Sequence, residues 1–137
     1  MKACVMCRRR GNAVIEAVLV IPILLLLAFG TVEFGHFFFV KHGVQGAARE
    51  GARAAIVAGA TNADVNAAVN TSMTASGLQA SGYVVTTNPA SIDGAASGTN
   101  ISVTVECNWG TVGLRPMAMI NANKAVRGST VMRKEAN

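Results

Sequence analysis

The feature that most constrains this chain is an apolar run near its N-terminus, because no charged residue occurs over residues 17–32. With residues 12–16 in front of it, the run reaches the ~20 residues that a helix needs to cross a hydrocarbon core of ~30 Å. It therefore predicts a transmembrane helix over residues 12–33. Arg8, Arg9 and Arg10 come directly before it. By the positive-inside rule, the N-terminus then lies in the cytoplasm and the C-terminal part is exported.

A cleaved secretory signal peptide also has a basic start and an apolar run. Its cleavage site, a stretch of the A-x-A type, should follow the run. Here the run passes instead through Gly30 into Glu33 and then into three consecutive phenylalanines at residues 37–39. We therefore expect the apolar helix to be retained.

The net charge of +5 belongs mostly to the first residues of the chain. Lys2 and the three arginines supply +4, whereas residues 12–137 contain eight basic and seven acidic residues, a net charge of +1. No basic stripe interleaved with aromatic residues follows. The charge pattern thus argues against a nucleic-acid partner.

Residues 34–60 are rich in alanine and lack proline, which favours a helix that continues beyond the membrane as far as Gly59. A second helix should begin at Thr61, since Asp64 stands three residues later as in a capping box. It should end before Gly77, and its apolar residues repeat at helical spacing: Val65, Val69 and Met73.

The pattern then changes to a period of two. Residues 101–107 alternate apolar and polar side chains, which is the clearest strand signature, and residues 83–88 and 126–133 are weaker strands. Pro116 is placed to open a short helix. The predicted class is α+β: a basic leader (1–11), a transmembrane helix (12–33), its helical extension (34–60), and a small exported domain (61–137) with a second helix and an antiparallel sheet of about three strands.

Glu16 lies about one turn into the apolar segment. A carboxyl group in the hydrocarbon core costs a few kcal/mol, so an acid there is treated as functional by default. The plainer alternative is that Glu16 sits near the cytoplasmic interface, hydrated or paired with Arg10.

The segment around Glu16 resembles the class III signal of type IV pilin-like proteins, which has basic residues, a glycine, and a glutamate at position five of the mature chain. Residues 8–56 are very similar to the TadE-like pseudopilins of the tight-adherence (Tad/Flp pilus) machinery. The matching features are the segment from Arg8 to Gly11, "VIE" at 14–16, Pro22, "EFG" at 33–35 and "AAREGAR" at 47–53.

This resemblance implies that a prepilin peptidase recognises Arg8, Arg9 and Arg10 and cuts between Gly11 and Asn12 on the cytoplasmic side. It implies a single-pass protein of the bacterial inner membrane with a periplasmic domain, a role in pilus assembly for adherence or secretion, and incorporation into a pilus as a further expectation. Its partners would be the inner membrane, the peptidase, other pilin or pseudopilin subunits and the Tad assembly machinery.

A physical reason for Glu16 follows from such a cut. The new α-amino group of Asn12 on a neighbouring subunit would compensate the carboxylate; at ~4 Å and an effective dielectric of ~20 the attraction is about 4 kcal/mol before desolvation is subtracted. The alternative function is an unprocessed, signal-anchored periplasmic binding or interaction domain. It predicts an intact leader and a stable soluble fragment from about Thr61.

Other candidate sites are weak. Cys4 and Cys7 form one C-x-x-C without a second pair, which is poor support for a zinc site. Cys107 falls on the apolar face of its strand, so we expect a buried thiol. Glu33 and His36 have E-x-x-H spacing but no second such pair, and we interpret them as an interfacial charge and a membrane-boundary residue. No motif for nucleophilic or phosphate chemistry is present, so we expect neither an enzyme nor a cofactor.

Overall fold

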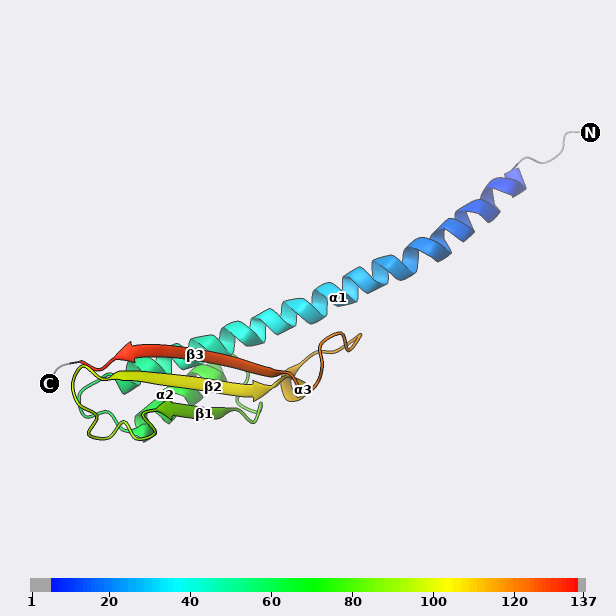
Figure 1. Ribbon diagram of the computed structural model, residues 1–137. Helices are drawn as coiled ribbons and strands as arrows, with labels where there is room; N and C mark the ends of the chain where they lie inside the picture. The colour runs from blue at the N-terminus through cyan, green and yellow to red at the C-terminus, as the bar shows by residue number, and fades with distance from the viewer. Residues whose placement is uncertain (1–5, 136–137) are drawn as a thin grey trace, which may run out of the picture.

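In the computed structural model, which describes residues 6–135 and the side chains from Ala13 onward, a long helix carries a small α+β domain at one end (Figure 1). The predicted fold class is confirmed. The elements are α1 (Met6–Ala55), α2 (Asn62–Ala75), β1 (Val84–Asn88), β2 (Asn100–Asn108), α3 (Trp109–Val112) and β3 (Ala125–Arg133).

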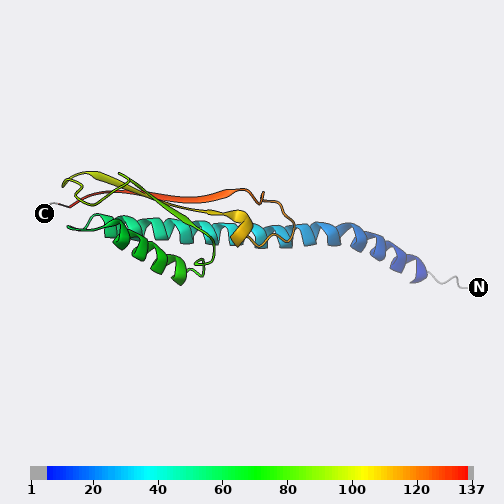
Figure 2. The same cartoon turned by 90° about the horizontal axis from the view of Figure 1, so that it is seen from below.

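Helix α1 has 50 residues, which at ~1.5 Å per residue gives a rod about 75 Å long. Its N-terminal half projects away from the domain (Figure 1) and bends in the blue part of the ribbon (Figure 2). Pro22 lies in this half, where it removes one backbone hydrogen bond and favours such a bend. The helix ends at Ala55 instead of continuing to Gly59, whose φ of 74° lies in the left-handed region.

Helix α2 begins and ends where its sequence predicts. The Asp64 backbone N–H donates to Thr61 Oγ1 (3.3 Å), and the Thr61 N–H donates to Asp64 Oδ2 (2.9 Å), which completes the capping box. Gly77 follows the helix with a φ of 69°. The apolar residues at helical spacing are all buried: Val65, Val69 and Met73.

The sheet is antiparallel in the order β1-β2-β3. Its central strand β2 turns one face toward the helices, so that the molecule has a sheet layer and a helix layer (Figure 2). The alternation predicted for this strand is confirmed, because four residues on that face are buried: Ile101, Val103, Val105 and Cys107. The Cys107 thiol is therefore a core group, as expected.

The second half of α1 belongs to the core of the domain. Its buried residues pack against α2 and the sheet: Val40, Val44, Ala47, Ala48 and Ala52. A Cβ added to Gly51 would lie 2.6 Å from Val69 Cγ2, and one added to Gly128 would lie 2.7 Å from the Val44 carbonyl oxygen. Glycine is thus required at residue 51, where α1 packs against α2, and at residue 128, where β3 lies against the backbone of α1. A fragment that begins at Thr61 would lack this helix.

The short helix predicted after Pro116 is wrong. The helical turn lies earlier, in α3, where Asn108 Oδ1 accepts a hydrogen bond from the Gly110 N–H (2.8 Å). After Pro116 the chain bends, and Ala118 has a φ of 52°, which no α-helix contains. The Met117 and Ile120 N–H groups of this segment donate hydrogen bonds to a side chain of α1, which is described below.

Candidate functional site

The free segment of α1, which we define as residues 13–29, is exposed along its whole length. Its large apolar side chains are between 41% and 71% exposed, and they occur on every side of the helix. A helix that is apolar all round suits a hydrocarbon environment or a bundle of apolar helices. Within the described residues, α1 is the one helix long and apolar enough to cross a membrane. Its stretch from Ala13 to Val32, which includes the free segment, measures about 30 Å and matches a bilayer core.

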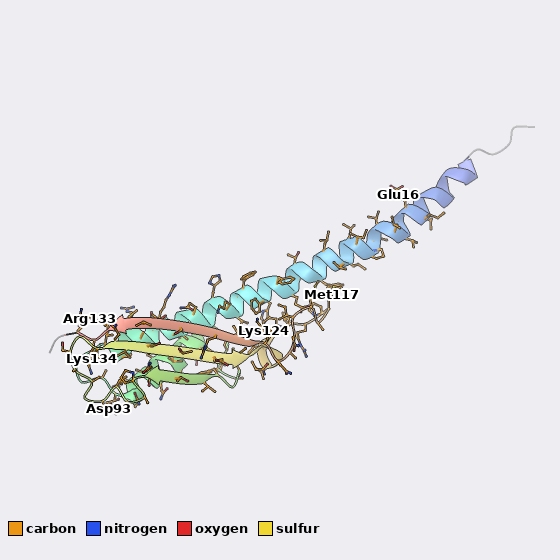
Figure 3. The ribbon with its side chains drawn as sticks, viewed as in Figure 1. Glu16, Asp93, Met117, Lys124, Arg133 and Lys134 are labelled. Carbon is orange, nitrogen blue, oxygen red and sulfur yellow. The ribbon has the colours of Figure 1, made fainter. Side chains whose placement is uncertain are left out.

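Glu16 is exposed on the free segment and far from the domain (Figure 3). Among residues 13–135 no basic side chain lies within salt-bridge distance of it. Among the side chains described from Ala13 onward, the Glu16 carboxylate is thus the single polar group on the free segment. A carboxylate in hydrocarbon is costly unless water or an opposite charge compensates it.

The predicted cleavage residues, Gly11 and Asn12, lie on the same helix, because α1 begins at Met6. The side chains of Arg8, Arg9 and Arg10 are outside the described residues, as are Cys4 and the start of the leader. Glu16 follows Gly11 by five residues, about 7.5 Å along the axis. The arginines, the glycine and Glu16 therefore occupy one continuous stretch of helix.

Where the free segment meets the domain, Glu33 is buried and not exposed as an interfacial charge. Its exposed fraction is 0%, and both carboxylate oxygens accept backbone hydrogen bonds: Oε1 from the Ile120 N–H (2.8 Å) and Oε2 from the Met117 N–H (3.3 Å). Both donors lie in the loop between α3 and β3, residues 113–124, which we call the α3–β3 loop. Backbone donors leave no pattern in a sequence, so this contact had no sequence signal.

One turn further along α1, His36 also contacts the domain instead of marking only a membrane boundary. Its Nε2 is 2.8 Å from the Val112 carbonyl oxygen, and its ring lies 5.7 Å from that of Trp109. Phe37 packs edge-on against the same indole at 5.2 Å. Glu33 and His36 are therefore occupied by structural contacts. No cluster of three or more His, Cys, Asp or Glu side chains suited to a metal occurs in the part of the chain described here.

These contacts fix the domain to α1 at the point where the free segment leaves it. The free segment therefore extends from the domain as a continuation of a core helix, without a flexible linker (Figure 1). The free segment is an apolar rod with one acid near its end. Its surface suits contact with lipid and with similar helices.

Residues 11–53 match the family described as TadE-like protein. The match begins at the glycine of the predicted cleavage site and includes the free segment, Glu33 and His36, and most of the part of α1 that packs in the core. No curated protein and no solved structure matches the chain.

Proposed function

We propose that the chain is a membrane-anchored pseudopilin that acts in assembly of a Tad/Flp-type pilus for adherence or secretion. The match of residues 11–53 to the TadE-like family supports this proposal. A prepilin peptidase removes residues 1–11 by cutting between Gly11 and Asn12. The protein then stays in the inner membrane, with its new N-terminus on the cytoplasmic side and its domain in the periplasm, until it is taken into the assembly.

The observation that carries this proposal is the free segment. A soluble protein does not expose about 25 Å of helix that is apolar on every side. The domain does not bury any side chain of the free segment. The segment therefore needs lipid around it before assembly and other apolar helices around it afterwards. Both environments are those of a pilin-like subunit.

Glu16 supports the same proposal, because it is the acid on that surface and it is available to a neighbour. Its partner would be the α-amino group of Asn12 on an adjacent subunit. At ~4 Å and an effective dielectric of ~20, the attraction is about 4 kcal/mol before desolvation is subtracted. Asn12 and Glu16 are about 6 Å apart along the axis, so two identical helices pair them only when staggered. A helical assembly provides such a head-to-tail contact.

The cleavage step is tested by co-expressing the full chain with its prepilin peptidase and measuring the intact mass. We expect loss of residues 1–11 and an N-terminal Asn12. Gly11→Val should block the cut by adding bulk beside the scissile bond. Gly35→Ala is the matched control, because a Cβ there meets nothing within 4 Å. A functioning protein with an intact leader contradicts the proposal and favours the unprocessed, signal-anchored periplasmic domain.

The assembly step is tested with Glu16→Ala and Glu16→Gln in the host. Both should be cleaved normally and should reduce pilus formation, because each leaves the neighbouring ammonium uncompensated. Glu50→Gln is the control, since Glu50 is exposed on the domain part of α1 and forms an ion pair with Arg53 on the same helix. Normal piliation with Glu16→Ala would remove Glu16 from the proposal while leaving cleavage untouched.

A further inference from the structure

We propose that the α3–β3 loop is a second membrane contact, which rests in the headgroup layer of the periplasmic leaflet beside the exit of α1. This inference depends on the proposed anchoring of the free segment and goes beyond it. The domain is thus seated on the bilayer surface and does not stand clear of it on a helical stalk.

The loop extends from the domain along α1 toward the free segment, and Met117 lies beside the helix (Figures 1 and 3). Met119 Sδ is 3.7 Å from the place where a Cβ of Gly30 would be. Gly30 is about 3 Å inside the outer end of the 20-residue span that closes at Val32. The sulfur therefore lies at the height of the hydrocarbon boundary.

The side chains of the loop suit that height. Leu114, Met117 and Met119 are exposed by 55%, 40% and 49%. Met119 lines an apolar hollow together with Leu26 and Phe34 of α1. The apolar surface of the loop is thus continuous with that of the free segment, and lipid that covers one also reaches the other.

The charges of the loop suit the headgroups. Arg115 and Lys124 are exposed, and they precede and follow Met117 and Met119 in the chain. Between Glu106 and Glu135 the sequence has no acidic residue. Cations that flank an apolar patch at this depth meet lipid phosphates, and anionic lipids attract them further.

The loop is also held at a fixed height. Glu33 binds the N–H groups of Met117 and Ile120, so the backbone of the loop is fastened to α1 at the level of the boundary. A protein partner would also accept an apolar patch. However, the patch lies beside residues 26–30, within the membrane span itself, where lipid is already present.

The test uses the full chain in vesicles of phosphatidylethanolamine and phosphatidylglycerol. Cys4 and Cys7 are replaced by serine, and single cysteines are introduced at Met119, Leu24 or Val131 for spin labelling. Leu24 reports the free segment, and Val131 is an exposed side chain of β3 in the domain. Relaxation by oxygen, which enters lipid, is compared with relaxation by a water-soluble nickel chelate. An unsubstituted parent corrects for labelling of the buried Cys107.

We expect the oxygen-to-nickel ratio at Met119 to lie between those of the other two positions and to exceed that of Val131 by about threefold or more. A label at Leu114 gives a second reading if Met119→Cys disturbs the fold. Arg115→Glu with Lys124→Glu should lower the ratio at Met119, and replacing phosphatidylglycerol by phosphatidylcholine should lower it too.

Two results would overturn the inference, and they differ in what else they affect. If Leu24 is embedded while Met119 and Leu114 are as accessible to nickel as Val131, the loop is not in the membrane and its apolar patch is left for a protein partner. If Leu24 itself is aqueous, the anchoring proposed above fails, and the loop contact fails with it.

Discussion

Removing the Glu33 carboxylate should free the α3–β3 loop without unfolding the domain. The side chain accepts two backbone hydrogen bonds, from Ile120 at 2.8 Å and from Met117 at 3.3 Å, and it is fully buried. A hydrogen bond to a charged group contributes about 1.5–3 kcal/mol, so the two bonds give about 3–6 kcal/mol before the cost of burying the carboxylate is subtracted. Burial of the charge offsets roughly half of this gain and leaves about 1.5–3 kcal/mol. We take about 2.7 kcal/mol, near the upper end of that range, as the net effect of Glu33→Ala.

That free energy corresponds to about a hundredfold increase in the opening equilibrium of the loop, at 1.4 kcal/mol per tenfold change. Glu33→Gln is a finer change. Its amide oxygen can keep the shorter bond to Ile120, whereas its NH₂ group faces the Met117 N–H, donor against donor. We expect about a tenfold increase for the Met117 amide and a smaller one for Ile120.

Amide hydrogen exchange resolved by residue, with the full chain in detergent micelles, measures this opening directly. Glu50→Ala is the matched control on the same helix, because its ion pair with Arg53 is exposed and long, at 3.4 Å. Such pairs contribute about 0–1 kcal/mol, and none of that acts on the loop. Unchanged protection of the Ile120 amide in Glu33→Ala would refute the reasoning.

Three further predictions concern the domain. Gly128→Ala should lower the free energy of unfolding by about 3 kcal/mol in chemical denaturation, because its Cβ would meet the backbone of α1 at 2.7–2.8 Å. Gly46→Ala, whose Cβ meets nothing within 4 Å, should raise it by up to about 1 kcal/mol, and an equal loss in both variants would contradict this. Hydrogen bonds from the backbone N–H and then the hydroxyl of Thr61 lower the pKa of Asp64 below its ordinary value of 3.8. The ionised Asp64 carboxylate should therefore stabilise the fold fully above pH 3.8, and this stabilisation should be lost as the pH falls through the lower native pKa. Asp64→Asn should remove this part of the pH dependence of thermal unfolding. Burial, with a smaller effect of the Glu106 charge, raises the pKa of the Cys107 thiol. In a chain whose Cys4 and Cys7 are replaced by serine, iodoacetamide should therefore react with Cys107 only after unfolding. Rapid labelling of the native protein would count against a core thiol.

The elements that follow from local rules could be predicted from the sequence. The capping box of Thr61 and Asp64 fixed the start of α2, because both hydrogen bonds form within four residues. The alternation around Val103 and Val105 gave the central strand and its buried face. The apolar run gave the free segment, since the length and polarity of a helix that spans a membrane are properties of the sequence alone.

The contacts between distant residues could not be predicted in this way. Pro116 has a good position for opening a helix, but the N–H groups of Met117 and Ile120 bind Glu33, more than 80 residues earlier in the chain. Glu33 itself has the sequence context of an interfacial charge. It is buried because the α3–β3 loop packs against α1 at this position. The need for glycine at residue 128 likewise depends on which backbone crosses it.

The sequence by itself determined an apolar helix with an acid near its start, a second capped helix and a two-faced strand, because hydrophobic period, capping and charge act over a few residues. Only the tertiary structure decided that the second half of α1 is a core helix of the domain, and that Glu33 and His36 bind α3 and the α3–β3 loop to α1 just beyond the free segment. The physical reason is that these contacts join a side chain to backbone groups 76 or more residues away, and every residue type except proline carries a backbone donor.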